Sequence, residues 1–491
     1  MPGVNERQRL IPARRSVIPA CDVSTLSDFQ RLVKQTADVV GIGGYKLGFE
    51  LTVPNGLREV VAIARDHTKL PLIYDLIYDH QKAGNDIPQT GSKFATAARE
   101  SGVDAVILFP FTSPATQSEW TRAAQGEGLT VLVGAHMTHV QFLESEGGYI
   151  ADSAPERIYK LAIDQGVRDF VVPGNKTEFV QRYRELFEGL LGSDGFTLYA
   201  PGFVAQGGSI TDAGKVAGEN WHAIVGTALY KAPDIRQAAV DLTSQISLED
   251  DNGLHEEKLR IWKVERARSI QERTLEILKQ TGAVLDGHFA LKSGRHGEQY
   301  VNKNLPEAYP RDIAEICNMM ARGFADQDID VVVGPATGGI ILATHVASAL
   351  SRMTGREILG VYAEEEKTPE GKAKLVLKRG YDHLVSGKRV LAVDDIVTTG
   401  GSLLKTVSAI IEADGVVVGA SDIWNRGSVK TEETGAPVLH SLVNKEMPTY
   451  QPGPDTCPSC AKGIPIDENV GHGKQVAKVI VDLSKNLPTA S

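Results

Sequence analysis

The chain has 491 residues, which at roughly 100–200 residues per domain predicts two to four domains and excludes a single small module. Hydrophobic residues make up 42% and charged residues 23%, as in soluble globular proteins, and the net charge of −10 argues against general binding to nucleic acid or membrane surfaces. Four cysteines are too few for a disulfide framework, and no apolar signal or membrane-spanning stretch is present, so we expect a soluble cytoplasmic protein.

Short apolar runs alternate with longer amphipathic stretches in the first half of the chain. The runs lie at 16–23, 39–49, 71–79, 105–111, 130–136, 169–175, 197–203 and 222–229. Each is rich in β-branched residues without strict alternation, as expected of parallel strands buried on both faces. Such strands separated by helix-length segments predict a (β/α)8 TIM barrel. A doubly wound sheet is the alternative, which the strand count and the polar residues at strand ends disfavour.

The composition changes after Asp241. Residues 247–258 are polar and acidic, which is typical of a linker, and a long helical pattern runs from about Leu259 to Gln280. Four further strands, at 330–339, 357–364, 388–402 and 415–424, predict a smaller open α/β sheet. We therefore expect a barrel domain at 1–245, a linker at 246–258 and a second α/β domain at 259–491.

Charged residues follow the predicted barrel strands, at the ends where TIM barrels carry their catalytic groups. Asp79, Lys82 and Asp86 come directly after the third run, while Asp22 and Lys46 end the first two. Opposite charges at a strand end are costly to desolvate unless they are paired, and such a cluster can tune pKa values for proton transfer. For the third run taken alone, a solvated loop is an equal alternative. Later strand ends carry Thr138, Pro201 and Gln206.

The segment KRVLAVDDIVTTGGS (388–402) carries the sharpest local signal. A buried strand ends in Asp394 and Asp395, and the small residues Thr398, Thr399, Gly400, Gly401 and Ser402 open a helix. Hydroxyls and glycine amides at a helix N-terminus favour phosphate, whereas an acidic pair suits sugar hydroxyls. The segment therefore predicts a sugar-phosphate site. An ordinary capped strand–turn–helix is the alternative.

This segment resembles the phosphoribosyl-pyrophosphate (PRPP) motif of type I phosphoribosyltransferases, and two further segments narrow the resemblance to orotate phosphoribosyltransferase. FALKSGRHGEQYVN (289–302) is similar to the orotate segment, where Lys292 reaches the substrate, and VVGPATGGI (332–340) is similar to the pyrophosphate loop. The resemblance implies that Arg426 pairs with the orotate carboxylate. It also implies that Mg2+ enters with PRPP, held mostly by PRPP oxygens and water rather than by protein side chains.

The family places a mobile loop with a basic residue over the PRPP of the partner subunit. The corresponding stretch here, 362–381, has acids at 364–366 where a basic residue is often found. Lys367, Lys372 or Lys374 supplies the cation on this interpretation, and the spacing does not choose between them. A solvated loop is the alternative for these lysines.

The barrel resembles orotidine 5′-phosphate decarboxylase. The matching segments are ACDV (20–23), YKLGFEL (45–51), DHQKAGNDIPQTG (79–91), HMTH (136–139) and APGFVAQGGS (200–209). The resemblance implies that Asp22 contacts ribose, that Lys82 donates the proton that replaces CO2, and that Asp79 holds Lys82. It further implies that Asp86 comes from the neighbouring subunit of a homodimer or larger oligomer, and that no cofactor is needed. Thr138 then contacts the pyrimidine, and Pro201, Gln206 and Gly207 lie at the phosphate loop.

Two departures from the decarboxylase pattern stand out. The spacing of Asp79, Lys82 and Asp86 is one residue longer at each step than in the family, and Thr227 stands where the family has a phosphate-binding arginine. Lys231 or Arg236 is a candidate replacement. Without one, the loss of a charge-assisted contact costs ~1.5–3 kcal/mol and predicts reduced decarboxylation.

Together, the two resemblances imply the paired activities of the bifunctional UMP synthase family. Orotate and PRPP give orotidine 5′-phosphate in the second domain, and the barrel converts it to UMP and CO2. Three alternatives remain: a barrel acting on another sugar phosphate, as hexulose-phosphate synthase does; an impaired barrel; and a PRPP-sensing regulatory protein. The acidic balance and the lack of an evident helix-turn-helix disfavour the last.

Cys457-Pro-Ser-Cys460 is a single Cys-x-x-Cys motif. Structural zinc needs four ligands, which here require a second chain or the distant His472. We therefore expect a reduced pair of surface thiols.

Overall fold

The computed structural model describes residues 9–75, 77–78, 81–246, 252–291, 294–302, 305–368 and 373–468, with the backbone alone for 77–78, 81–82, 252–263 and 265–266. The chain divides into two compact units, Met1–Lys263 and Val264–Ser491. The division lies inside α11 (Asn252–Gln280), which begins before the expected Leu259. The segment predicted to be a linker therefore includes the start of a helix. Its composition is polar overall, but its leucine, glutamate and lysine residues are strong helix formers.

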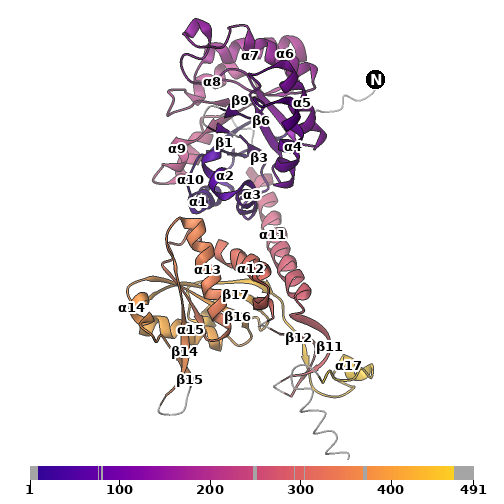
Figure 1. The fold of residues 1–491 in the computed structure, drawn as a ribbon, viewed down its shortest axis with the longest axis vertical. Coiled ribbons are helices and arrows are strands. Elements are labelled where there is room, and N and C mark those ends of the chain that lie inside the picture. The colour runs from indigo at the N-terminus through magenta and orange to yellow at the C-terminus, as the bar shows by residue number, and fades with distance from the viewer. Residues whose placement is uncertain are drawn as a thin grey trace, which may run out of the picture. The chain divides into compact units, whose positions relative to one another are not determined.

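The N-terminal unit is a closed barrel of parallel strands (Figure 1). Its strands are β1 (Arg15–Cys21), β2 (Tyr45–Leu47), β3 (Leu72–Tyr74), β6 (Ala105–Leu108), β7 (Thr130–Gly134), β8 (Asp169–Val171), β9 (Thr197–Pro201) and β10 (Trp221–Val225). β1 pairs in parallel with both β2 and β10, which closes the barrel. The predicted TIM barrel is confirmed, and a doubly wound sheet is excluded.

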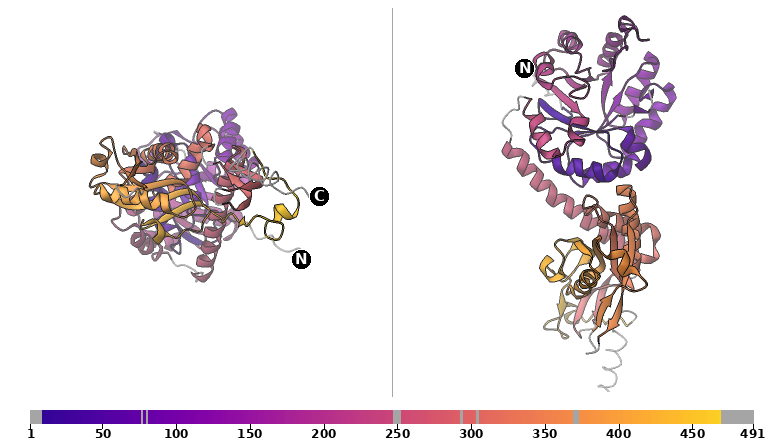
Figure 2. Two further views of the ribbon diagram at one scale, coloured as in Figure 1. Left: turned by 90° about the horizontal axis from the view of Figure 1, so that it is seen from below. Right: turned by 90° about the vertical axis from the view of Figure 1, so that its left-hand side faces the viewer.

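Helices lie around the outside of these strands (Figure 2). They are α1 (Leu26–Thr36), α2 (Phe49–Asn55), α3 (Leu57–Arg65), α4 (Gly91–Glu100), α5 (Pro114–Gly126), α6 (Ala154–Asp164), α7 (Thr177–Leu191), α8 (Ile210–Ala217), α9 (Thr227–Tyr230) and α10 (Ile235–Thr243), with single turns η1 (Pro88–Thr90) and η2 (Glu144–Glu146). α1 shows the pattern: Thr25 caps its first turn by accepting a hydrogen bond from the Asp28 N–H, and Phe29 and Leu32 are buried. The helices cover the outer face of the strands, and the charged side chains that line the cavity of the barrel come from the ends of the strands.

The third barrel strand ends earlier than the sequence indicated. β3 stops at Tyr74, and the chain continues into a small antiparallel hairpin, β4 (Ile77–Tyr78) with β5 (Gln81–Lys82). Asp75 is the first residue beyond the strand, and its N–H donates to the Leu47 carbonyl at 3.0 Å. The run at 71–79 is therefore not one strand. The barrel strand ends at Tyr74, and Asp75 lies at its carboxyl end, where its side chain lines the cavity.

The C-terminal unit contains a six-stranded sheet in the order β15-β14-β13-β16-β17-β18. The strands are β13 (Val331–Pro335), β14 (Leu359–Lys367), β15 (Ala373–Val376), β16 (Arg389–Val397), β17 (Val416–Asn425) and β18 (Leu439–Asn444). The four predicted strands are confirmed, but the count was incomplete at both edges. β15 is antiparallel to β14, and β18 is parallel to β17. Both edge strands are partly exposed, and polar residues such as Lys374 in β15 and His440 and Ser441 in β18 interrupt their apolar residues, so neither shows the apolar run of the central strands.

The remaining elements of this unit are helices on the sheet and a separate small sheet. The helices are α12 (Pro310–Arg322), α13 (Gly338–Thr354), α14 (Tyr381–Val385), α15 (Gly401–Glu412) and α16 (Thr431–Thr434), with the turn η3 (Pro306–Ala308). The small sheet contains β11 (Val284–Ala290), β12 (His296–Val301) and β19 (Thr449–Tyr450), followed by α17 (Pro458–Ala461). Within the described part of the chain, every helix is too short or too polar to cross a bilayer.

We expect the aromatic cluster under α7 to contribute strongly to the stability of the barrel. Phe187 is fully buried, and its ring centroid lies 4.2 Å from that of Phe170 and 5.2 Å from that of Tyr159. Phe187→Ala should therefore lower the free energy of unfolding by ~3–5 kcal/mol, measured by denaturant titration. Leu190→Ala is the matched control, because Leu190 lies on the same helix with 51% of its surface exposed. Equal losses in the two variants would contradict this packing.

Candidate active sites

A cavity of about 370 Å³ lies at the carboxyl ends of the barrel strands. Several of the predicted residues line it together: Asp22, Lys46, Thr138, Pro201, Gln206 and Thr227. They come from segments that are far apart in the sequence, and the parallel strands bring them to one end of the barrel. A cavity of this size with a few convergent polar groups is typical of a small-molecule site.

Lys46 lies between two carboxylates in this cavity. Its Nζ is 3.2 Å from Asp22 Oδ1 and 3.3 Å from Asp75 Oδ2, and Lys46 and Asp75 are both buried. Gly48 makes room for this contact, because a Cβ there would lie 2.3 Å from Asp22 Oδ1. Burial lowers the pKa of Lys46, but Asp22 and Asp75 outweigh it, so the pKa is raised and Lys46 stays cationic.

Asp75 is a member of this array that sequence reasoning missed. We had treated 71–79 as one strand and therefore selected Asp79, which lies outside the described residues. The backbone of Lys82 lies on β5, but its side chain is not among those described, and Asp86 is exposed before η1. A charged residue inside an apolar run was the signal that marked the true end of the strand.

A second buried polar group, His136, also lines the cavity. The Lys176 ammonium donates to its Nε2 at 3.1 Å and to Glu146 at 2.7 Å, so the imidazole Nδ1–H donates to the Tyr183 hydroxyl at 2.8 Å. Burial and the neighbouring Lys176 lower the pKa of His136 to about 4. His136 is therefore neutral at physiological pH, and its ring nitrogens are engaged with Lys176 and Tyr183.

The predicted phosphate end of the cavity lacks a strong cation. Among the described residues that line the cavity, none is an arginine. Arg236 forms an ion pair with Asp38, and Lys231 is exposed, and neither belongs to the lining. Gly207 does not line the cavity either. Its N–H donates to the Val204 carbonyl at 3.0 Å.

In the C-terminal unit, the predicted PRPP loop forms a second hollow. It is lined by Asp394 and by residues 396–403, which include Thr398, Thr399, Gly400, Gly401 and Ser402. Gly400 has a φ of +73° and precedes the first turn of α15, so glycine permits the tight entry into the helix. Asp395 is buried and not part of this lining; its Oδ1 accepts from the Ile396 N–H at 2.6 Å.

Asp422 is a further acid that the sequence did not single out. It lies on β17 directly opposite Asp394, is fully buried, and accepts a hydrogen bond from Ser441 at 2.6 Å. Burial, and then the charges of Asp394 and Asp395, raise its pKa to about 8. At the carboxyl ends of these strands, burial together with the neighbouring carboxylates therefore favours the protonated form of Asp422 at neutral pH.

The other predicted transferase residues lie around the same strand ends. Arg426 donates to Thr398 Oγ1 at 2.8 Å, and burial lowers its pKa although Tyr300 and Asp395 oppose the shift. Lys292 lies outside the described residues; nearby, Gly294 has a φ of +76°. Where β13 meets α13, Gly334 of the strand and Gly339 of the helix pack so closely that a Cβ on Gly334 would lie 2.1 Å from the Gly339 carbonyl oxygen.

The lysine-bearing stretch at 362–381 is largely a hairpin of β14 and β15 rather than a loop. Lys367 is the last residue of β14 and is exposed, whereas Lys374 forms an ion pair with Glu412 at 3.5 Å. Lys372 lies outside the described residues. Glu364 pairs with Arg379, so the acids of this stretch serve partly to hold the hairpin.

Comparison with known proteins identifies both units. Residues 303–439 match the phosphoribosyl transferase domain, and residues 15–242 match the orotidine 5′-phosphate decarboxylase / HUMPS family. The orotate phosphoribosyltransferase of Chlorobium phaeobacteroides (strain BS1) is 36% identical over 193 residues, which cover 39% of this chain and 92% of that protein. The orotate phosphoribosyltransferase of Pelotomaculum thermopropionicum is 35% identical over 201 residues, covering 40% and 94%. The chain belongs to the orotate phosphoribosyltransferase family.

In front of this orotate phosphoribosyltransferase domain, the chain carries a domain of the decarboxylase / HUMPS family. Similar solved structures include orotidine 5′-monophosphate decarboxylase of Methanocaldococcus jannaschii, at 22% identity and a TM-score of 0.41, covering 48% of this chain and 99% of that one. Another is the UMP synthase of Leishmania donovani, at 16% identity and a TM-score of 0.36, covering 88% of this chain and 90% of that one. The chain thus joins domains of two enzyme families.

The ion-pair array predicts a specific consequence of removing Lys46 from the decarboxylase-family domain. Lys46→Met leaves the buried carboxylate of Asp75 without its cation, so we expect the barrel to lose ~3–5 kcal/mol of unfolding free energy. Chemical denaturation measures this loss. Lys93→Met on α4 is the control, because Lys93 is an exposed lysine of the same domain. If both variants unfold alike, the array does not stabilise the barrel.

Proposed function

We propose that this chain makes UMP from orotate in two consecutive steps. The C-terminal unit transfers the phosphoribosyl group of PRPP to orotate, releasing pyrophosphate, and the barrel then removes CO2 from the resulting orotidine 5′-phosphate. The observation that carries the proposal is the presence of both families in one chain, since the product of one reaction is the substrate of the other.

In the transferase step, the loop after β16 binds both the phosphate and the ribose of PRPP. The N–H groups and hydroxyls of Thr398 to Ser402 bind the phosphate at the start of α15, and Asp394 accepts hydrogen bonds from the ribose hydroxyls. Arg426, held by Thr398, faces the orotate carboxylate. Because substitution at the anomeric carbon passes through a cationic, oxocarbenium-like state, catalysis here is mainly positioning and charge stabilisation.

The donor set at these strand ends fits Mg2+. Asp394, Asp395 and Asp422 offer carboxyl oxygens at neighbouring positions of β16 and β17, and Mg2+ prefers oxygen ligands. When bound with PRPP, Mg2+ neutralises the charge of the leaving pyrophosphate. We propose that PRPP oxygens and water supply most of its ligands, with the acids holding the ribose beside it.

In the decarboxylation step, the cavity of the barrel holds the nucleotide. Asp22 contacts the ribose, Thr138 the pyrimidine, and the segment around Gln206 and Gly207 the phosphate. Loss of CO2 leaves negative charge at C6 of the ring, and Lys82 supplies the proton. We propose that Asp75 acts on the substrate carboxylate: its buried carboxylate repels that group, and the departure of CO2 relieves this repulsion.

Two features of the proposal concern the assembled protein. Asp86 is exposed in this chain and, on our interpretation, completes the barrel site of a neighbouring copy, which makes a homodimer the smallest active form. The four cysteines are free thiols, which supports a reducing compartment such as the cytoplasm.

A coupled assay separates the two steps. Purified protein is supplied with orotate, PRPP and Mg2+, and orotidine 5′-phosphate and UMP are followed together. Lys82→Ala should accumulate orotidine 5′-phosphate with a loss of UMP of at least ~100-fold, since a proton donor contributes ~10²–10⁴-fold. Lys93→Ala, on the surface of the same domain, should behave like the parent protein.

Asp394→Asn gives the reciprocal result. It should stop orotate consumption while leaving the decarboxylation of supplied orotidine 5′-phosphate intact. A folded parent protein that consumes orotate but releases no CO2 from orotidine 5′-phosphate would overturn the assignment of the barrel and favour another sugar-phosphate substrate. Salt-dependent DNA binding without turnover would favour a regulatory role instead.

The missing arginine leads to a gain-of-function prediction. Thr227 lines the cavity at the start of α9, and its hydroxyl is 3.2 Å from that of Tyr230. Thr227→Arg adds a charge-assisted phosphate contact of ~1.5–3 kcal/mol, so KM for orotidine 5′-phosphate should fall by roughly 10-fold or more. Steady-state decarboxylation kinetics measure this change.

Lys231→Ala is the control for this variant. Lys231 is exposed and does not line the cavity, so its removal should leave KM unchanged. If KM instead rises 10-fold or more, Lys231 already serves as the phosphate cation and the cavity does not lack one.

A further inference from the structure

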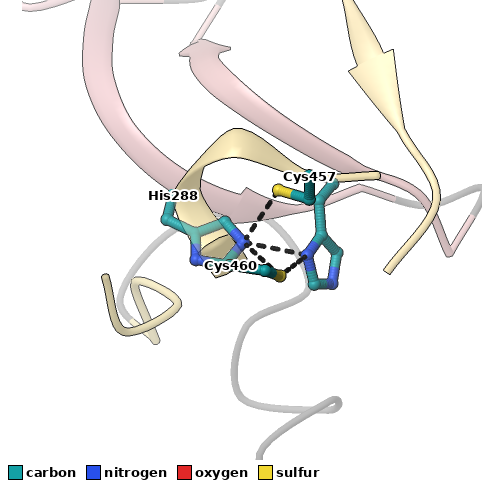
Figure 3. A group of neighbouring side chains, drawn as sticks. His288, Cys457 and Cys460 are labelled. Carbon is teal, nitrogen blue, oxygen red and sulfur yellow. Dashed lines mark hydrogen bonds between the residues drawn. The ribbon is translucent and has the colours of Figure 1, made fainter. Parts of the chain in front are cut away.

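Four metal-binding side chains converge on one point in the C-terminal unit, outside both proposed active sites. His288 lies on β11 and His296 on the paired strand β12, while Cys457 precedes α17 and Cys460 lies within it. The donor atoms all lie within 4.8 Å of one another. Figure 3 shows the imidazole of His288 and the sulfurs of Cys457 and Cys460 pointing toward one another. The expected surface pair of thiols is therefore wrong, since Cys457 is only 1% exposed.

The spacing of the donor atoms suits a tetrahedral ion. His288 Nε2 is 3.6 Å from Cys457 Sγ and 3.6 Å from Cys460 Sγ, and His296 Nδ1 is 3.2 Å from Cys460 Sγ. Zinc–nitrogen bonds of ~2.0–2.1 Å and zinc–sulfur bonds of ~2.3 Å give tetrahedral edges of roughly 3.3–3.8 Å. The two imidazole nitrogens, at 2.8 Å, are closer than such an edge and need only a small separation.

The surroundings orient the cluster for metal binding. The carbonyl oxygen of Ile464 lies 2.6 Å from His288 Nδ1, and because a carbonyl only accepts, this nitrogen carries the proton. The lone pair of Nε2 therefore points at the cysteines. Ligating histidines are typically fixed in this way by a hydrogen bond from the other ring nitrogen.

We propose that His288, His296, Cys457 and Cys460 bind one structural Zn2+ ion. Two thiolates and two imidazoles form a soft donor set that selects zinc over Mg2+, so this site is distinct from the oxygen-lined PRPP site. Four protein ligands leave no open position for a substrate, which makes the role structural rather than catalytic. The sequence suggested an incomplete set because the histidines lie far from the Cys-x-x-Cys motif along the chain.

The ion fixes the segment that follows β19 to the β11–β12 hairpin. His296 directly follows Arg295, whose guanidinium donates to Thr449 Oγ1 at 2.8 Å, and the Asp467 N–H donates to the His288 carbonyl at 2.8 Å. The turn that joins the two strands lies within 289–302, the segment assigned to orotate. The consequence for orotate binding rests on the proposed function, whereas the presence of the metal does not.

Metal content tests the proposal without any activity measurement. The full chain, produced in zinc-supplemented medium and dialysed, should contain about one zinc per chain by elemental analysis. Cys457→Ser and Cys460→Ser should each lower this to below about a tenth. Cys317→Ser, which changes a buried cysteine on α12 of the same unit, should keep its zinc.

Cobalt substitution covers the case in which these variants fail to fold. In the intact parent chain, Co2+ bound at this site should give a thiolate-to-cobalt charge-transfer band and tetrahedral d–d bands. Absence of zinc in the parent chain together with absence of these bands would overturn the proposal. A Cys457–Cys460 disulfide in protein purified under reducing conditions, or full zinc retention in both serine variants, would do the same.

Discussion

Parallel strands whose faces are covered by helices leave one kind of place where charged side chains meet a ligand, the carboxyl ends of the strands. Both units obey this constraint. In the barrel it brings Asp22, Lys46 and Asp75 together from three strands, and in the open sheet it sets Asp394 beside Asp422. Because these ends are partly buried, every charge placed there must be balanced by a neighbour, a proton or a ligand.

The two sites meet that requirement in opposite ways. In the barrel, Lys46 lies between the carboxylates of Asp22 and Asp75, so each of these charges has a partner of opposite sign. In the transferase unit the acids repel one another, and Asp422 keeps its proton at neutral pH. The chain has a net charge of −10, so it attracts anionic substrates only through local features such as the helix N-terminus at Thr398–Ser402.

The small sheet of the C-terminal unit depends on contacts between distant segments. β11 and β12 form a hairpin, β19 adds a third strand more than a hundred residues later, and α17 contributes the two cysteines. The proposed zinc ion would tie these segments together, as metal ions do in small assemblies that lack a large hydrophobic core. The hairpin that would hold the proposed ion also carries 289–302, the segment that resembles the orotate segment of the family.

The sequence by itself determined the barrel, the four central strands of the open sheet and most of the candidate residues, because buried parallel strands and phosphate loops leave strong local patterns. It misjudged what local patterns do not encode. The end of β3 at Tyr74, which places Asp75 beside Lys46, depends on how the strands pair in the barrel. The edge strands β15 and β18 are held by their neighbours rather than by their own composition. The pairing of Asp422 with Asp394, and of two histidines with two cysteines, exists only once the chain has folded. Tertiary structure decided these features because each joins residues that are distant in sequence, and their energies arise only when burial brings them together.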